Sequence, residues 1–217
     1  MQSLSKWFRQ SSAVRIFIGL ALAILVLAVA GWLVTGPYKA IVAGFDSNIR
    51  YAMRQIQSPM WTSLLLTITK LGSTLYLAIV GCIAGVSFLV LRWFRPFGLF
   101  VLVMAGQAAL HHGFKWVFAR PRPPALLNYP AAESFSFPSG HVIGALCLYG
   151  SIAWIVSKRL ETPAAKAGIW LFAGVLIFLV AMSRVYIGVH YPTDVVAGLI
   201  GSSIWLLAVM TADRTPL

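Results

Sequence analysis

Long apolar stretches alternate with short polar segments along the chain. The apolar stretches cover about residues 16–34, 71–91, 97–118, 139–157, 167–182 and 192–210. An α-helix needs about 20 such residues to cross the hydrocarbon core of a bilayer, and the last three stretches are somewhat shorter. The pattern predicts an all-α protein, an integral membrane bundle of six transmembrane helices.

The first apolar stretch has two interpretations. Ala28, Val29 and Ala30 resemble the cleavage site of a secretory signal peptide. The stretch continues past them through Trp32 to Val34, however, and is long enough to span a membrane. We therefore expect a retained first transmembrane helix.

Residues 35–70 are mixed in character, and their first part has a helical period. The apolar residues that recur there are Ile41, Val42, Phe45, Ile49 and Met53. This spacing is typical of an amphipathic helix that lies in the membrane interface. We predict an interfacial amphipathic helix between the first and second spans.

The polar segment at residues 120–138 is rich in proline and begins Arg-Pro-Arg-Pro-Pro. Proline lacks the backbone donor that a helix in lipid requires, so this segment should lie outside the hydrocarbon. No repeat or low-complexity segment divides the chain. Residues 1–217 are predicted to form a single membrane domain.

Composition strengthens the membrane prediction. Of the 217 residues, 59% are hydrophobic and 10% are charged, against about 25% charged in an ordinary soluble domain. The mean hydropathy is +0.85. These values exclude a soluble globular protein and a disordered one, because disorder needs few apolar groups and many charges.

The net charge of +12 raises a separate question. In a soluble protein such an excess of Lys and Arg would suggest nucleic acid. In a chain this apolar it indicates anionic lipid head groups or a phosphate-bearing substrate. We expect the lipid bilayer and a membrane lipid substrate as partners, with no nucleic acid and no obligate protein partner.

No cofactor is predicted. Cys82 and Cys147 lie inside apolar stretches without ligand spacing, so neither a disulfide nor a metal site is expected from them. The five carboxylates are scattered along the chain and include no acidic cluster suited to magnesium.

Three short segments carry most of the polar chemistry. They cover residues 115–123, 137–141 and 183–194, and in the six-span topology all three fall at the same side of the membrane. The cations among them are Lys115, Arg122 and Arg184. Guanidinium forks match phosphoryl oxygens, so these three side chains are candidates to orient a phosphoryl group.

The other two segments look like helix starts. Pro138, Ser139 and Gly140 would place free backbone N–H groups toward an anion, with His141 within reach of it. Pro192 suits the first turn of another helix, which would set His190 just before that turn and Asp194 within it.

Two histidines with different neighbours suggest two roles. A carboxylate on one imidazole nitrogen supports the other nitrogen as a nucleophile, which favours His190 with Asp194. His141 would then donate a proton to the leaving oxygen. The cations would supply the charge stabilisation that a metal supplies elsewhere, so a metal-independent reaction is expected.

The same segments resemble the three signature motifs of the type-2 phosphatidic acid phosphatase superfamily. Those motifs read Lys-x6-Arg-Pro, Pro-Ser-Gly-His and Ser-Arg-x5-His-x3-Asp. The matching positions are Lys115, Arg122, Pro123, Pro138, Ser139, Gly140, His141, Ser183, Arg184, His190 and Asp194. Residues 133–141 look like the bacterial membrane members that act on phosphatidylglycerophosphate and undecaprenyl diphosphate.

The resemblance implies a set of roles. It implies a phosphohistidine intermediate on His190, with His141 as general acid. It implies phosphate contacts from Lys115, Arg122, Ser139, Gly140 and Arg184. The substrate would be a lipid phosphate monoester or diphosphate such as phosphatidylglycerophosphate, undecaprenyl diphosphate or phosphatidate.

Basic residues indicate the orientation. With a cytoplasmic N-terminus, the inner ones are Lys6, Arg9, Arg15, Arg92, Arg95, Lys158, Arg159, Lys166 and Arg214. The outer ones are Lys39, Arg50, Arg54, Lys70, Lys115, Arg120, Arg122 and Arg184. Setting aside the three phosphate-site cations turns nine against eight into nine against five. Because Lys and Arg are enriched inside, this predicts cytoplasmic termini and an extracytoplasmic site in the plasma membrane.

Four polar residues outside the fixed motif positions have more than one candidate role. His111 and His112 precede Lys115 by about one turn, and we expect a structural or hydrogen-bonding role, although one of them would be able to face the site. Arg120 is expected to be an interfacial or lipid-phosphate contact, with a substrate role as the alternative. Glu133 would bind a polar head group or pair with Arg120.

Two further predictions concern the position of the interfacial helix and the class of protein. We expect the segment around Phe45 and Tyr51 to cover the site and form a lipid entrance. A lipid phosphatase is favoured over a transporter of phosphorylated lipids or anions. A transporter would use the same cations but needs neither a nucleophile nor a proton donor, and no inverted repeat is visible.

Overall fold

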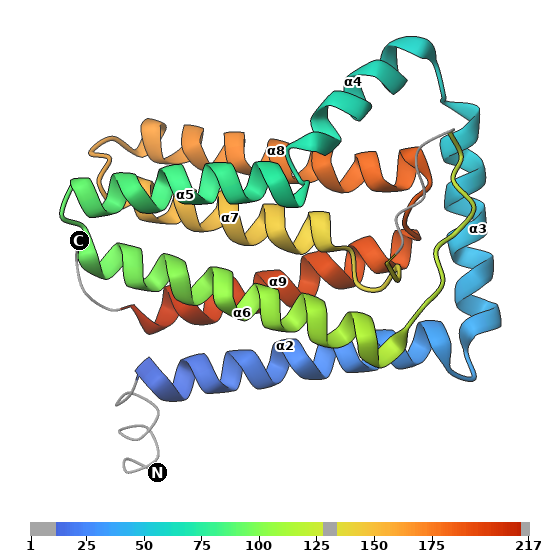
Figure 1. Cartoon of the computed structure of the whole chain (residues 1–217), viewed down its shortest axis with the longest axis horizontal. Coiled ribbons are helices and arrows are strands. Elements are labelled where there is room, and N and C mark those ends of the chain that lie inside the picture. Colours follow the sequence, from blue (N-terminus) through green and yellow to red (C-terminus); the bar gives the residue numbers. More distant parts are fainter. Residues whose placement is uncertain (1–11, 128–133, 214–217) are drawn as a thin grey trace.

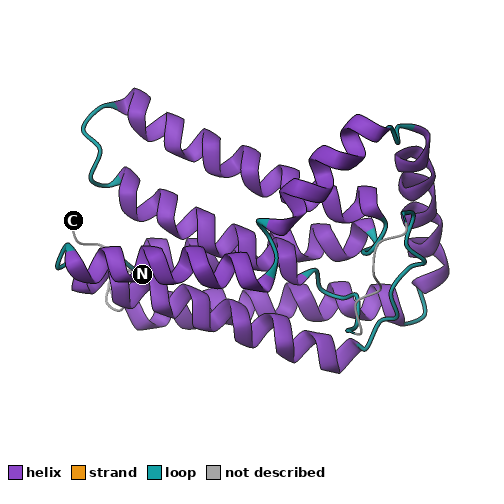
Figure 2. Ribbon diagram, turned by 45° about the horizontal axis from the view of Figure 1, so that its top comes forward, coloured by secondary structure: helices purple, strands orange, loops and turns teal. Residues whose placement is uncertain are grey.

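The computed structural model describes residues 12–127 and 134–213. Its described part contains helices and loops and no strands (Figure 2). The helices are α2 (Ser12–Thr35), α3 (Lys39–Gln55), α4 (Pro59–Lys70), α5 (Thr74–Val90), α6 (Phe94–Phe118), α7 (Gly140–Ser157), α8 (Pro163–Ile187) and α9 (Pro192–Ala212). The all-α prediction is confirmed.

Six membrane crossings fit this set of helices. Five of them, α2, α6, α7, α8 and α9, are long and apolar enough to span a membrane singly. The pair α4 and α5, which meet at a short break with a bend of 51°, makes a sixth crossing if the two helices form one broken span. The hydropathy pattern placed the second span over α5 and gave no indication that α4 is a separate helix.

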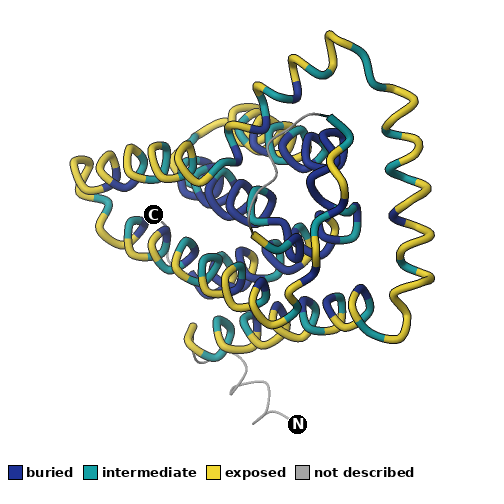
Figure 3. The backbone as a smooth tube through the Cα atoms, turned by 45° about the vertical axis from the view of Figure 1, so that its right-hand side comes forward, coloured by how far each residue is buried: buried dark blue, intermediate teal, exposed yellow. Residues whose placement is uncertain are grey.

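The spanning helices lie side by side, and α3 runs across one end of the bundle (Figure 1). The start of α2 and the end of α9 lie at the opposite end. The most buried helix is α7, which packs against α5, α6, α8 and α9 (Figure 3). Its side chains Leu148 and Ile155 are fully buried in the core, so its N-terminus is held in a fixed place near the α3 end.

The predicted fifth span, residues 167–182, was too short. In the structure α8 has 25 residues and starts where the Thr162 side chain accepts the Ala165 N–H at 3.2 Å, with Pro163 in the first turn. Lys166 is in the first turn and Arg184 in the last, whereas the prediction treated both as lying outside the helix. A helix end tolerates a cation when it reaches the interface or a polar site.

Gly188 ends α8 and turns the chain toward the next helix. Its φ is +83°, in the left-handed region that suits glycine, and it caps α8 by donating to Val185 O at 3.0 Å. A Cβ there would also meet the backbone nitrogen of Leu126 at 2.6 Å. Glycine therefore allows both the turn and the close approach of the loop that follows α6.

Polar contacts join helix ends at the side remote from α3. Asp213, just after α9, accepts hydrogen bonds from Lys158 Nζ at 2.7 Å and pairs with Arg95. Ser12 Oγ donates to Ala212 O at 2.6 Å, which ties the start of α2 to the end of α9.

Glycine also sets the spacing between α6 and α9. Gly106 faces the indole ring of Trp205, whose Nε1–H donates to Val103 O at 3.0 Å. A Cβ on Gly106 would overlap the ring. Small residues allow membrane helices to approach closely in this way.

We expect Gly106→Val to lower the free energy of unfolding by about 1–3 kcal/mol, because the added carbons must displace a buried Trp. Thermal denaturation in detergent measures the change. Gly98→Val is the matched control, since a Cβ at Gly98 in the same helix meets open space. An equal loss in both variants would contradict the packing explanation.

Candidate active site

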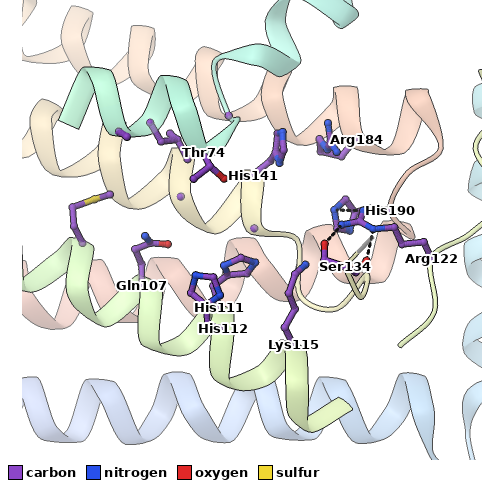
Figure 4. A pocket seen from close by; sticks show the side chains of 16 residues that line it. Thr74, Gln107, His111, His112, Lys115, Arg122, Ser134, His141, Arg184 and His190 are labelled. Atoms are coloured by element: carbon purple, nitrogen blue, oxygen red, sulfur yellow. Dashed lines mark hydrogen bonds between the residues drawn. The ribbon is translucent and has the colours of Figure 1, made fainter. Parts of the chain in front are cut away.

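A cavity of about 450 Å³ lies at the end of the bundle where α7 begins (Figure 4). Its walls come from α5, α6, α7, α8 and the loops around them. The polar side chains that line it are Thr74, Gln107, His111, His112, Lys115, Arg122, Ser134, His141, Arg184 and His190. One cavity thus collects residues from all three motif segments.

Of the eight predicted site residues, six line the cavity. They are Lys115, Arg122, Gly140, His141, Arg184 and His190. Ser139 and Asp194 are not among the lining residues and are fully buried. Figure 4 shows Lys115, His141, Arg184 and His190 around the same space.

Arg122 keeps its positive charge available to an anion. Its guanidinium donates to Ser134 O at 2.6 Å, Ser134 Oγ at 3.0 Å and Val189 O at 2.8 Å. It also contacts His190 Nε2 at 3.1 Å. Every one of these partners is neutral or only partially charged, so they orient the fork without cancelling its charge.

The other two cations are held in the same manner. Lys115 Nζ donates to Phe135 O at 2.7 Å, and Arg184 Nη1 donates to Thr69 Oγ1 at 2.6 Å. Lys115 and Arg184 are both buried. Three positive groups therefore border one small cavity, an arrangement that suits a phosphoryl dianion.

The start of α7 closes one side of the cavity. The Ser139 N–H donates to Asp194 O at 3.3 Å, so this group, which was expected to point at an anion, is already used. Ser139 Oγ is buried and has no hydrogen-bond partner in the described structure. A Cβ on Gly140 would overlap the His111 ring, so glycine is needed for His111 to pack here.

His190 is buried with Nε2 toward the cavity side. A guanidinium can only donate, so its 3.1 Å contact makes Nε2 the acceptor and places the proton on Nδ1. Nδ1 stands 3.5 Å from Asp194 Oδ2, which is long for a hydrogen bond. This tautomer places the lone pair on Nε2, the nitrogen that faces the cavity cations, where it accepts the hydrogen bond from Arg122.

Burial also determines the protonation state of His190. Desolvation lowers the pKa of its imidazole to about 4, although Asp194 acts in the opposite direction, and Arg184 and Arg122 lower it further. His190 is therefore neutral at physiological pH, as a nucleophile must be.

Asp194 is fixed by the helix that it begins. It is the third residue of α9, and its Oδ2 accepts the backbone N–H of Tyr191 at 3.0 Å. Its Oδ1 accepts from Arg120 Nη1 at 2.6 Å. Pro192 occupies the first turn of α9, as predicted.

The expectation for Arg120 was wrong. This side chain does not face lipid: it is buried and forms ion pairs with Asp194 at 2.6 Å and Asp46 at 2.8 Å. Its charge is offset by two carboxylates, unlike that of Arg122. The sequence places these two arginines only two positions apart and gave no signal of their different partners.

Three further expectations have mixed outcomes. His111 and His112 both line the cavity, with ring centroids 4.6 Å apart. The α3 helix is amphipathic as predicted, but Phe45 and Tyr51 are exposed and α3 does not line the cavity. The residue Glu133 lies outside the described residues.

Four polar neighbours of the site were not predicted from the sequence. They are Asp46, Thr69, Ser134 and Thr193. None of them belongs to a motif position, and Asp46 and Thr69 come from helices far from the motifs in sequence. Within the described residues, no group of three or more His, Cys, Asp or Glu side chains is arranged to hold a metal ion.

Known proteins resemble this chain in both sequence and fold. The model of the PAP2 superfamily matches residues 96–215. Phosphatidylglycerophosphatase B of Bacillus subtilis is 34% identical over 158 residues, which is 72% of this chain and 77% of that protein. Undecaprenyl-diphosphatase of Sulfolobus acidocaldarius is 33% identical over 109 residues, 48% of each protein.

A solved structure of a PAP2-type phosphatase has a similar fold. The crystal structure of a transmembrane PAP2-type phosphatidylglycerolphosphate phosphatase from Bacillus subtilis matches with a TM-score of 0.75 and 30% identity. The match covers 87% of this chain and 93% of that one. It includes most of the helical bundle and is not confined to the motif segments.

Fold and site together define a multi-pass membrane phosphatase that acts on lipids. The chain belongs to the PAP2 superfamily. The predicted family and the prediction of an enzyme instead of a transporter are confirmed.

We expect His190 to remain neutral, with its proton on Nδ1, as the pH falls from 7 toward 4, and to become protonated only near pH 4. An ordinary imidazole would titrate near ~6.5. Nitrogen chemical shifts of ¹⁵N-histidine-labelled protein measure both properties. The chain has four histidines, so His190→Gln identifies the signal. Titration near the ordinary value, or a proton on Nε2, would contradict the geometry.

Proposed function

We propose that this protein removes a phosphoryl group from a membrane lipid by way of a phosphohistidine on His190, without a metal ion. The observation that carries the proposal is the neutral His190 imidazole at the edge of a cavity with three cations. A transferring phosphoryl group spreads negative charge over its oxygens, and Lys115, Arg122 and Arg184 surround the space where those oxygens would lie.

In the first step Nε2 of His190 attacks phosphorus. The N–P bond forms as the bond from phosphorus to the lipid oxygen breaks, and His141 gives its proton to that oxygen. Asp194 stabilises the positive charge that develops on the His190 ring. In the second step water attacks phosphorus, His141 takes its proton, and the N–P bond breaks to release phosphate.

The phosphate would rest against the start of α7. Backbone N–H groups in the first turn of a helix favour an anion. Gly140 lines the cavity in that first turn, and the buried Oγ of Ser139 has no hydrogen-bond partner in the described structure. These residues, with the three cations, form the proposed phosphate site.

An apolar groove offers a place for the lipid tail. A second cavity of about 450 Å³ lies along α5 and α6 and shares Leu77, Ala78 and Met104 with the polar cavity. Its remaining lining is almost wholly apolar and continues along the two helices to Leu89 and Phe97. A lipid would therefore place its phosphate among the cations while its chain stays in contact with hydrocarbon.

The relatives and the basic residues suggest the substrate and the orientation. Phosphatidylglycerophosphate is the proposed substrate, because the B. subtilis relatives named for it match over most of this chain. Undecaprenyl diphosphate and phosphatidate are the alternatives. Nine inner against five remaining outer basic residues support cytoplasmic termini in a bacterial plasma membrane, with the site on the outer face.

We expect purified protein in mixed micelles to release phosphate fastest from phosphatidylglycerophosphate within a panel that also holds undecaprenyl diphosphate and phosphatidate. His190→Ala should lower the rate on every substrate by at least ~10⁴-fold, because the attacking nitrogen is lost. Phosphate release is measured, and size-exclusion chromatography checks that the variant is folded. Near-normal turnover by a folded variant would rule out His190 as the nucleophile.

We also expect activity to persist in excess EDTA and to be inhibited by vanadate. The cations already stabilise the charge of the transition state, and vanadate adopts the five-coordinate geometry of an attacked phosphorus. Initial rates with and without each reagent decide the point. If EDTA abolished activity and a divalent metal restored it, the metal-free mechanism would be wrong.

A further inference from the structure

A carboxylate outside the three motifs lies at the end of a chain of contacts that leads to His190. Within α3, Asp46 alone is buried, and its side chain is only 1% exposed. The rest of this amphipathic helix is exposed or partly exposed. Burying a carboxylate costs free energy unless it is paired with donors or cations. The partners of Asp46 therefore indicate what this burial achieves.

Asp46 makes three close contacts. Its Oδ2 pairs with Arg120 Nη2 at 2.8 Å and accepts from Thr193 Oγ1 at 2.8 Å. Its Oδ1 accepts the Thr193 backbone N–H at 3.0 Å. Both oxygens are therefore bound, and both partners are next to the catalytic pair in space or in sequence.

Arg120 continues the chain of contacts. Its Nη1 donates to Asp194 Oδ1 at 2.6 Å and to Thr193 Oγ1 at 2.9 Å. Its guanidinium lies over the Tyr191 ring at 3.9 Å from the centroid. The guanidinium plane is thus fixed from three sides, and it sets the position of one oxygen of Asp194.

The other oxygen of Asp194 faces His190. Because Oδ1 is bound to Arg120 and Oδ2 accepts from Tyr191, the carboxylate cannot rotate freely, and Oδ2 is kept near Nδ1 of His190. The net charge of the residues behind Asp194 also affects the imidazole ring of His190. Asp46, Arg120 and Asp194 carry one net negative charge, whereas Arg120 and Asp194 alone would carry none, which would weaken the stabilisation of a positive imidazole ring.

We propose that Asp46 is a positioning residue for the catalytic pair: through Arg120 and Thr193 it fixes the Asp194 carboxylate and so orients His190 for attack. The inference deepens the function proposed above and rests on it. It assigns the interfacial helix α3 a part in the reaction, although α3 contributes no wall to the cavity.

The test compares three variants. Asp46→Asn removes the charge with little change of shape, and Thr193→Val removes the bridging hydroxyl while Asp46 and Arg120 remain paired. Asn48→Ala is the matched control, because Asn48 is an exposed polar residue two positions along the same helix. Each variant is assayed in mixed micelles with the lipid phosphate that the wild-type protein hydrolyses fastest.

We expect Asp46→Asn to lower kcat by roughly 10–100-fold, the effect of a misplaced catalytic group. The KM should change by less than about twofold, because the phosphate contacts remain. Thr193→Val should lower kcat less, and Asn48→Ala should not change it. A purely structural ion pair predicts instead a lower melting temperature with kcat unchanged for the folded fraction, and that result would overturn the proposal.

A binding measurement separates the positioning of His190 from the proposed function. Vanadate bonds to the attacking nitrogen, whereas inorganic phosphate needs only the cations. Thermal stabilisation should therefore show about tenfold weaker vanadate binding in Asp46→Asn and unchanged phosphate binding, following the loss expected when a positioning contact is removed. If the wild-type protein hydrolyses no lipid phosphate, the proposed function fails, and the vanadate comparison still decides the role of Asp46.

If Asp46→Asn does not fold, Thr193→Val provides the same comparison with a smaller change. Vanadate and phosphate affinities that fall together, or that both stay at the wild-type value, would overturn the positioning role.

Discussion

Mutual repulsion among Lys115, Arg122 and Arg184 is the constraint on which the arrangement of this bundle depends. Three cations converge at one end of a bundle whose helices are long and apolar enough to span a membrane. Each donates to a carbonyl or hydroxyl oxygen that helps to orient it, namely Phe135 O, Ser134 O and Thr69 Oγ1. An anion placed among these cations would offset their mutual repulsion, which favours the binding of a group such as phosphate.

The same constraint explains why neighbouring arginines differ. Arg122 has neutral partners and faces the cavity, while Arg120 is neutralised by Asp46 and Asp194 behind it. If both had faced the phosphate, four cations would have been confined in one place. The loop after α6 thus turns one arginine toward the cavity and pairs the other with the Asp194 carboxylate.

Much of this could be predicted from the sequence. Hydropathy alone locates the spans, because a stretch long enough to cross a bilayer must satisfy its own backbone as a helix. The motif spacing brings Lys115 and His190 to one site, since helix ends on the same side of a membrane meet at one surface. The roles assigned to these residues stay predictions until His190 variants are assayed.

The other features of the fold and the site depend on contacts between particular residues, and these contacts produce no periodic pattern in the sequence. The pairing of Asp46 with Arg120 joins residues 74 positions apart, and nothing local to either indicates the other. The true start of α8 depends on the Thr162 cap, which extends the helix through Lys166. A hydropathy profile treats a basic residue as a boundary, although a cap and an interfacial position can keep it inside the helix.

The contact between Ser12 and Ala212 has a consequence for how the protein is made. The two residues are 200 positions apart, and α2 packs along α9 with Gly19 against Ala208. Synthesis runs from the N-terminus, so α2 enters the membrane long before its partner exists. During that interval the face bearing Gly19, Ala23 and Leu27 must rest against lipid or another helix, and the bundle reaches its final packing only after the ribosome has completed α9.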